Sequence, residues 1–521
     1  MKMFWFLFFS VLAQTIAAQD IDVQHYKYKI RLSDKDDTVY VLAYIDFVVK
    51  NTAESIVFDL NSLQNNKGMI IESVNFSGIT DSAVTFIFSD DKLIIPLSGV
   101  VNAGTKKKLS VFYKGIPRDG LIISKNKFGE RTFFSDNWPN RAHNWMLCND
   151  DPADKASVEF IVTAPVHYKV ISNGILIEEI INGADKITHW KEELPIPTKV
   201  MVIGVAPFAV KEYTSSPVPV SAWVYKKDST KGFYDYELAD EIIKFFSDYI
   251  HPYPFKKLAN VQSTTIFGGM ENASAIFYSE KSVTGDRRSE ALIAHEVVHQ
   301  WFGNSATEKN FSHLWLSEGF ATYMTNIYLE SKYGKDTILT RLKDDRNKII
   351  DFKNVHHQPV IDTVSDYLDL LNANSYQKGG WFLHMLRQEV GDHTFQQIIR
   401  SYYKKYLLLN ADTRDFQKVA EEVSGRKLKQ FFDQWLYTPG MPILKITWSQ
   451  DKNVVTVIID QLQQNVFHFP LQLAIVSSEN GVMHDTIHMN TKRKQIQFVV
   501  NSSINNIIPD PETKLLFEEI K

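Results

Sequence analysis

The stretch His295-Glu296-Val297-Val298-His299, followed by Glu318, decides how the centre of this chain is organised. Residues four apart on an α-helix project from the same face, so both imidazoles can reach a single ion. Glu296 lies about 100° around the helix from His295, so its carboxylate can border that ion without binding it. The spacing therefore predicts a metal site and a general base on one helix, completed by a carboxylate from the next helix.

Two imidazoles and one carboxylate suit zinc and leave a fourth position free for water. The alternative is a pair of histidines on a solvated helix face, which the segment 314–321 around Glu318 argues against. Asp286 or Ser289 can cap the first helix and Ser317 the second, which places Glu318 in a first turn that favours a carboxylate. We expect one Zn²⁺ per chain, bound by His295, His299 and Glu318 from two antiparallel helices.

Outward from this centre, the periodicity of apolar residues changes along the chain. Before it, residues 23–207 are strand-like, with runs rich in Val, Ile, Tyr and Phe at 27–32, 40–48, 92–97, 109–113 and 159–164. A helical period starts near residue 234 and continues to 436, interrupted by strand-like stretches at 258–266 and 274–278. After the breaker cluster at 438–442, strand-like runs return.

These changes predict an α+β multidomain fold. A chain of 521 residues is too long for one core, and roughly three or four domains are expected. We expect an N-terminal antiparallel β domain, a mainly α catalytic domain and a small C-terminal β domain, covering residues 19–210, 211–440 and 441–521.

Composition excludes several classes of function. The chain is 44% hydrophobic and 23% charged, as ordinary globular proteins are, and its net charge of −4 gives no electrostatic reason to bind nucleic acid. Residues 1–18 resemble a signal peptide, with Lys2 before an apolar run that is too short to span a membrane. We therefore expect export to the periplasm or the medium without a membrane anchor. Cys148 is the only cysteine and is expected to be a small buried apolar residue.

Two further motifs contain residue types that enzymes use. They are Gly268-Gly269-Met270-Glu271-Asn272 and Tyr376-Gln377-Lys378-Gly379. Taken alone, Gly268-Gly269 is typical of a turn with Glu271 as a surface charge, and Tyr376 is typical of a packing residue at the start of a helix.

With these motifs in this order, the chain resembles the M1 family of zinc metallopeptidases, within the gluzincins. The resemblance implies a saddle-like β domain, a thermolysin-like catalytic domain and a C-terminal β-sandwich. Many members add a long C-terminal helical domain. Because the residues after Gly440 are strand-like, we expect a short form that lacks it.

The resemblance also implies roles for individual residues. His295, His299 and Glu318 would bind zinc, Glu296 would be the general base, and Tyr376 would donate a hydrogen bond to the oxyanion. Glu271 would pair with the free α-ammonium of a peptide, and its neighbours Gly268, Gly269, Met270 and Asn272 would bind the substrate.

The chain departs from the family pattern in two places. Gly269 stands where many relatives have alanine, which from the sequence is a small change. Relatives also place a Gln or Glu from the β domain beside the substrate amine. Here the corresponding stretch, residues 134–140, offers Asp136 or Asn137, and the sequence does not decide between them.

The leading hypothesis is a zinc aminopeptidase acting on peptides with a free N-terminus. Three alternatives stay open: an epoxide hydrolase of the kind known in this family, a catalytically silent peptide-binding relative, and a secreted thermolysin-like endopeptidase. The sequence predicts neither the preferred first side chain nor the oligomeric state.

Overall fold

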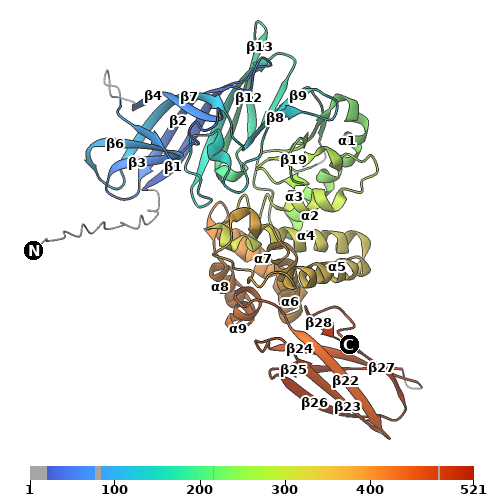
Figure 1. The fold of residues 1–521 in the computed structure, drawn as a ribbon. Helices are drawn as coiled ribbons and strands as arrows, with labels where there is room; N and C mark the ends of the chain where they lie inside the picture. The colour runs from blue at the N-terminus through green and yellow to red at the C-terminus, as the bar shows by residue number, and fades with distance from the viewer. Residues whose placement is uncertain (1–19, 77–83, 215, 479–480, 521) are drawn as a thin grey trace, which may run out of the picture.

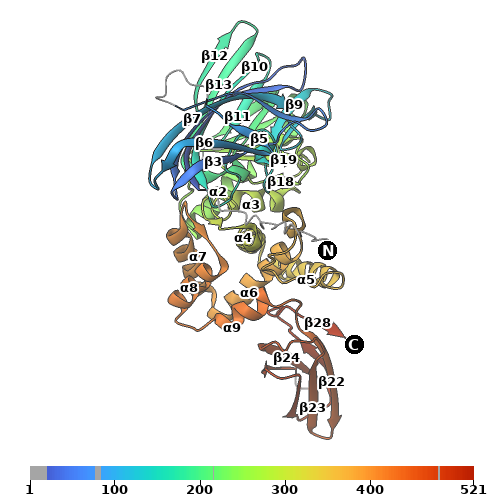
Figure 2. The same cartoon turned by 60° about the vertical axis from the view of Figure 1, so that its left-hand side comes forward.

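The computed structural model describes residues 20–76, 84–214, 216–478 and 481–520. A multi-sheet β region, a helical region and a second strand-rich region follow one another along the chain (Figure 1). The helices α4 to α9 lie between the two strand-rich regions in both views (Figures 1 and 2). This arrangement confirms the predicted order of β, helical and β regions. The predicted signal peptide at residues 1–18 lies outside the described residues.

The largest sheet of the N-terminal region has seven strands in the order β12-β13-β10-β1-β2-β7-β4. All neighbours are antiparallel except β1 and β10, which are parallel. Along β2 every second side chain is buried, as in a sheet with one face on the core. The strands are β1 (Ile21–Arg31), β2 (Val39–Val49), β4 (Gly68–Phe76), β7 (Lys106–Ile116), β10 (Lys155–Pro165), β12 (Ile175–Asn182) and β13 (Asp185–Pro197). Four of the predicted strand runs overlap β1, β2, β7 and β10.

Two smaller sheets complete this region. One is formed by β3 (Ala53–Asp59), β6 (Lys92–Val101) and β5 (Ile87–Ser89). The other has the order β11 (Lys169–Ser172), β14 (Ile203–Ala206), β9 (Arg131–Ser135) and β8 (Leu121–Lys125). Cys148 is buried, as predicted, and its backbone pairs with that of Asp59.

A five-stranded mixed sheet begins the middle region of the chain. Its order is β15 (Phe208–Tyr213), β16 (Val220–Tyr225), β17 (Leu258–Ser263), β19 (Ala275–Ser279) and β18 (Gly269–Met270). The strands β17 and β19 overlap the predicted stretches at 258–266 and 274–278. The expected domain boundary between residues 210 and 211 falls within β15.

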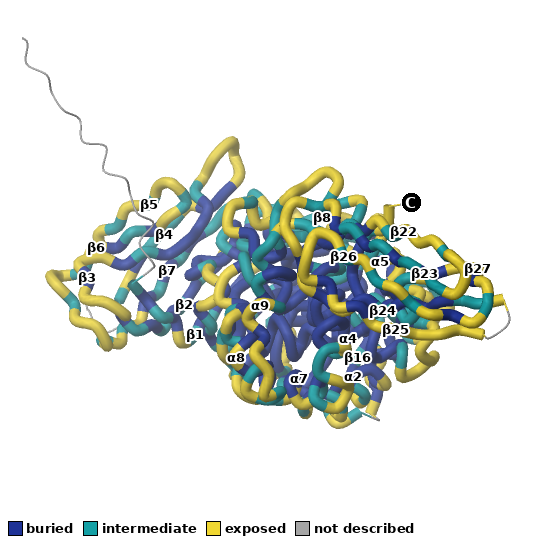
Figure 3. The backbone as a smooth tube through the Cα atoms, turned by 90° about the horizontal axis from the view of Figure 1, so that it is seen from below, coloured by how far each residue is buried: buried dark blue, intermediate teal, exposed yellow. Residues whose placement is uncertain are grey.

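Helix α4 (Trp315–Tyr333) lies at the centre of the helical region. It is buried continuously from Trp315 to Leu329, polar residues such as Glu318 and Asn326 included, and it packs against α3, α5 and α6. Figure 3 shows the buried segments gathered in the middle of the molecule. The other helices are α1 (Ser229–Tyr236), α2 (Leu238–Tyr249), α3 (Glu290–Val298), α5 (Lys335–Lys353), α6 (Gly379–Val390), α7 (Asp392–Tyr406), α8 (Thr413–Ser424) and α9 (Lys429–Phe432). Among the described residues, no helix is long and apolar enough to cross a membrane.

The C-terminal region contains two sheets, which confirms its predicted strand content. One has the order β26 (Arg493–Val499), β23 (Val454–Gln461), β22 (Ile443–Asp451) and β28 (Glu518–Ile520), and the other β25 (Val482–Met489), β24 (Phe469–Ser477) and β27 (Ile504–Pro509).

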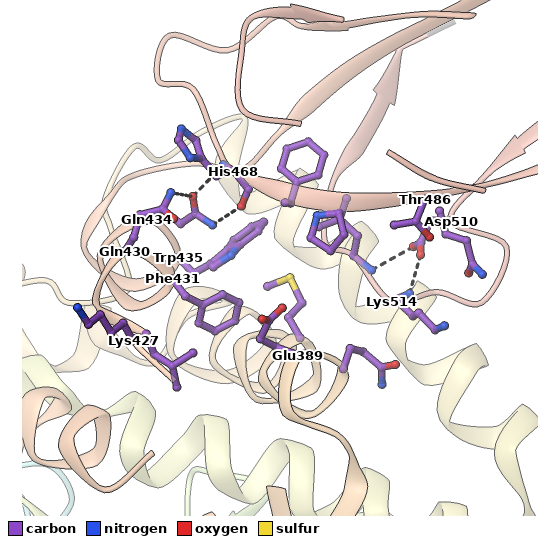
Figure 4. Close-up of a pocket in the computed structure, with 17 residues that line it drawn as sticks. Glu389, Lys427, Gln430, Phe431, Gln434, Trp435, His468, Thr486, Asp510 and Lys514 are labelled. Atoms are coloured by element: carbon purple, nitrogen blue, oxygen red, sulfur yellow. Dashed lines mark hydrogen bonds between the residues drawn. The ribbon is translucent and has the colours of Figure 1, made fainter. Parts of the chain in front are cut away.

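The junction between the helices and the C-terminal sheets is incompletely packed. A cavity of about 340 Å³ lies there, lined by Phe431 and Trp435 from the helical side, by His468 just before β24 and by Thr486 of β25 (Figure 4). Beside it, Arg346 of α5 binds Asp510 at 2.9 Å, and His384 of α6 lies 2.9 Å from the carbonyl oxygen of Thr513. These contacts fix the C-terminal region to helices that also pack on α4.

A buried ion pair joins the N-terminal β region to the middle region of the chain. The ammonium of Lys199 binds the carboxylate of Glu308, and both side chains are buried. Nearby, Lys155 of β10 donates to the carbonyl oxygens of Ser305 and Leu409 at 2.8 and 3.1 Å. The segment that connects α3 to α4 is thus bound by two lysines of the β region.

We predict that Lys199→Met lowers the free energy of unfolding by about 3–5 kcal/mol, because it leaves Glu308 charged and unpaired in the core. Lys309→Met is the matched control, since Lys309 pairs with Asp412 and Asp415 at the surface, where a pair contributes about 0–1 kcal/mol. Chemical denaturation measures both, and the double variant Lys199→Met/Glu308→Met should recover most of the loss. Equal costs for the two single variants would contradict this reading.

Candidate functional site

Three donor atoms from α3 and α4 converge on one point. His295 lies in the last turn of α3, His299 follows its end, and Glu318 lies in the first turn of α4. The Nε2 atoms of the two histidines are 3.2 Å apart, and each lies 3.3 Å from Oε2 of Glu318. Ligands about 2.0–2.1 Å from a tetrahedral zinc ion stand about 3.3–3.4 Å apart, so this triangle fits zinc. Within the described ranges, no other group of His, Cys, Asp and Glu side chains is placed to hold a metal ion.

The second helix begins earlier than the sequence suggested. A 3-10 turn at Phe311–His313, capped by the Asn310 side chain, continues directly through Leu314 into α4. The prediction of Ser317 as the cap is therefore wrong, because Leu314 already has helical backbone angles. Ser289 does occupy the position before α3, but its hydroxyl donates to the carbonyl of Ser282 instead of capping the helix.

The hydroxyl of Ser317 lies beside a proposed ligand. Its Oγ is 3.2 Å from Nδ1 of His299, and the same nitrogen is 3.1 Å from the carbonyl oxygen of Phe302. A carbonyl can only accept, so this contact favours the tautomer with the proton on Nδ1. The lone pair of Nε2 then points toward His295 and Glu318, as metal binding requires.

Glu296 lies against β18. Burial raises the pKa of its carboxyl well above the ordinary value, although His299 nearby lowers it. A Cβ atom at Gly269 would lie 2.3 Å from Oε1 of Glu296, so alanine there would require this carboxylate to move. Glycine instead of alanine at position 269 therefore affects the position of Glu296, the residue that the sequence predicts as the base.

The Gly268–Asn272 motif forms the edge of the five-stranded sheet. Gly269 and Met270 pair with Tyr278 and Phe277 of β19. The backbone carbonyl of Glu271 accepts from Gln300 Nε2 at 2.8 Å and from Asn304 Nδ2 at 2.6 Å.

The Glu271 side chain is held in the interior without a partner for one oxygen. Its Oε1 is buried and has no hydrogen-bond partner in the part of the chain that the structure describes. Burial raises the pKa of this carboxyl, while His299 lowers it. Its burial excludes the alternative reading of Glu271 as a surface charge.

Tyr376 lies in a π-helical turn, Asn374–Lys378, that leads into α6. Its ring stacks on His295 with the centroids 6.0 Å apart, and burial with the charge of Glu318 raises the pKa of its phenol well above 10. The turn sits close to Glu318 because Gly319 of α4 contacts Gly379 of α6, where a Cβ on Gly319 would lie 2.9 Å from the Gly379 Cα. Any larger residue would force α4 and α6 apart.

Most of the predicted site residues surround one cavity of about 240 Å³. Its lining includes His295, Glu296, Glu318, Gly268, Gly269, Met270, Glu271 and Tyr376. His299 contributes to the donor triangle from below the surface, and Asn272 is buried outside the lining. The lining also includes four residues that the sequence analysis did not identify: Trp138, Phe267, Leu292 and Leu371.

The two β-domain candidates for amine binding are occupied elsewhere. Asp136 accepts from Arg141 at 2.6 Å and from the Thr265 hydroxyl at 2.9 Å. The Asn137 amide donates to the Met201 carbonyl at 2.6 Å and accepts from the Trp145 indole at 2.9 Å. The residue from this stretch that reaches the cavity is Trp138.

We predict that Glu318→Gln weakens zinc binding by more than the roughly 10–100-fold that loss of an outer partner causes, because it replaces an anionic ligand. Ser317→Ala removes only the outer contact to His299 and should stay within that range. Zinc titration with a competing chelator measures both affinities. If the two variants bound zinc as tightly as the unmodified protein, the proposed ligand set would be excluded.

The sequence comparisons agree with this geometry. The profile described as "Peptidase family M1 domain" matches residues 234–435, and "Peptidase M1 N-terminal domain" matches residues 22–200. Aminopeptidase M1-C of Oryza sativa subsp. japonica is 28% identical over 448 residues, which cover 81% of this chain and 50% of that protein. Glutamyl aminopeptidase of Sus scrofa is 29% identical over 332 residues, which cover 60% of this chain and 35% of that protein.

The chain thus spans about half or less of the length of these curated relatives. The two profiles together cover the β region and the helices that carry the donor triangle, in the order that the motifs predicted. The chain belongs to peptidase family M1.

Proposed function

We propose that this protein is a zinc-dependent aminopeptidase that removes the first residue from peptides with a free N-terminus. The observation that carries this proposal is the buried, unpartnered Oε1 of Glu271 beside the donor triangle, as judged among the described residues. A free α-ammonium would pair with this carboxylate and fix the first residue over the metal. An internal peptide has no such cation and would leave the carboxylate unpaired, at a cost of about 1–3 kcal/mol.

His295, His299 and Glu318 would hold the zinc ion. When bound, zinc supplies a Lewis acid that lowers the pKa of a water molecule toward neutrality and polarises the peptide carbonyl. Glu296 would accept a proton from the attacking water and pass it to the leaving amine.

Tyr376 donates a hydrogen bond to the oxygen that becomes negative as water attacks the carbonyl. Its ring stacks on His295, which places the phenol within the same cavity. The high pKa keeps the phenol protonated at neutral pH, as a donor must be. Gly268 and Gly269 leave the edge of β18 open to the peptide backbone, with Met270 and Asn272 beside it.

We also propose the finer architecture that family membership suggests: a saddle-like β domain, a thermolysin-like catalytic domain and a C-terminal β-sandwich, divided near residues 210 and 440. Export through residues 1–18 is part of the same proposal.

The main competing function is a thermolysin-like endopeptidase. It would need the same metal and base but no partner for a substrate ammonium. Oε1 of Glu271 has no hydrogen-bond partner among the described residues, and a substrate ammonium would supply one. This favours the aminopeptidase.

We predict that Glu296→Gln binds zinc normally but lowers kcat by about 10²–10⁴-fold, because the amide cannot accept the proton. Zinc content and kcat on an aminoacyl amide check this. Glu290→Gln, on the same helix but bonded to Lys332 outside the cavity, is the control that should retain activity. A Glu296→Gln variant with unchanged kcat would refute the assignment of the base.

We predict that N-acetylation of a peptide lowers kcat/KM by about 10–100-fold or more, because Glu271 then remains unpaired. In Glu271→Gln the penalty for acetylation should shrink, since the amide needs no cation. Comparing one peptide with and without the acetyl group, in both proteins, measures the effect. Equal cleavage of the two peptides by the unmodified protein would favour the endopeptidase instead.

A further inference from the structure

Trp138 brings the N-terminal β region into the proposed active site. It follows β9 in the chain, is almost fully buried, and lines the same cavity as His295, Glu296 and Glu271. Its ring meets Phe267 edge-on at 6.5 Å between centroids and Phe311 at 5.8 Å. Phe311 in turn contacts Tyr367 at 4.7 Å, so aromatic contacts run from Phe267, just before β18, to the segment beside Leu371.

A network of polar contacts fixes this tryptophan. Arg141 donates to the carbonyl oxygen of Trp138 at 2.7 Å and to Asp136 at 2.6 Å. Asp136 also accepts from the hydroxyl of Thr265 and the backbone N–H of Ile266, at 2.9 and 3.3 Å. This polar network therefore joins the segment that contains Trp138 to the segment that leads into β18. A wall held in this way is preorganised before substrate arrives.

The indole N–H of Trp138 takes no part in that polar network. It is buried and has no acceptor within the described residues, so the side chain is held by its ring contacts and its backbone. Replacing Trp138 by phenylalanine would thus keep an aromatic wall and lose no hydrogen bond that the structure describes.

Beyond the groups assigned to metal, base, oxyanion and amine, the side chains that line the cavity are apolar. Trp138, Phe267, Met270, Leu292 and Leu371 form these walls. Its lining residues, so far as the structure describes the chain, include no lysine or arginine. Arg141 lies 5.7 Å from the Phe267 ring, but it is already paired with Asp136 and with Asp119 at 2.9 Å.

We propose that Trp138 is the specificity-determining residue for the first side chain of the substrate, and that it selects large apolar side chains. This inference rests on the aminopeptidase function proposed above. A leucyl, methionyl or phenylalanyl side chain buries apolar surface against Trp138, Phe267 and Met270. A glutamyl or arginyl side chain would be desolvated there without a partner. An alanyl side chain would leave the wall uncovered.

The test uses leucyl, phenylalanyl, alanyl, glutamyl and arginyl amides of one fluorogenic amine with the full chain loaded with zinc. We expect kcat/KM for the leucyl substrate to exceed that for the alanyl substrate by about 10-fold or more, and those for the charged substrates by about 100-fold or more. In Trp138→Ala the leucyl-to-alanyl ratio should fall about 10-fold. In Trp138→Phe most of this ratio should remain.

Trp448→Ala is the matched control, because Trp448 lies partly exposed on β22 of the C-terminal region. In this variant the leucyl-to-alanyl ratio of kcat/KM should be unchanged. A ratio between two substrates is insensitive to the fraction of folded enzyme, so a general loss of stability would not imitate the effect. An unmodified protein that prefers glutamyl or arginyl substrates, or a leucyl-to-alanyl ratio that survives Trp138→Ala, would overturn the proposal. If instead no free aminoacyl amide were cleaved, the proposed function itself would fail.

Discussion

The structure depends on a close approach of α3 and α4 that brings His295, His299 and Glu318 within 3.3 Å of one another. Burying two imidazoles and a carboxylate is costly unless they share a partner, and a divalent cation satisfies all three at once. The surrounding structure holds the two helices at this distance. Helix α4 is buried along most of its length, and the contact between Gly319 and Gly379 brings Tyr376 to the same point.

The N-terminal β region takes part in the site as well as in the fold. It supplies Trp138 to the cavity, and Lys199 and Lys155 bind the connection between the two metal helices. The packing of this interface and the geometry of the cavity are therefore coupled. A change that loosens this interface would disturb the connection between the metal helices and the aromatic wall together.

Local patterns were enough to predict much of this molecule. The four-residue spacing of His295 and His299 determines their common face, and Glu318 does lie in the first turn of α4. Strand runs in the N-terminal β region could be predicted because they are rich in Val, Ile, Tyr and Phe and are separated by turn residues. The donor triangle of His295, His299 and Glu318 could be predicted because its residues lie close together in the sequence and are positioned by helices.

What could not be predicted depends on contacts between distant segments. Trp138 reaches the cavity because Arg141 and Asp136 bind its segment to Thr265 and Ile266, and no local pattern encodes that pairing. Ser317 does not cap α4, because the 3-10 turn at Phe311–His313 leads directly into the helix, which begins before Ser317. The packing of Glu296 against Gly269 is likewise a tertiary contact, visible only once β18 lies beside α3.

We propose that one zinc ion joins α3 to α4. Anomalous diffraction from zinc-loaded crystals, recorded on either side of the zinc absorption edge, tests it most directly. The account predicts one strong peak per chain, about 2.0–2.2 Å from Nε2 of His295, Nε2 of His299 and an Oε atom of Glu318. A fully loaded crystal with no peak among these atoms, or with its zinc bound elsewhere, would contradict it.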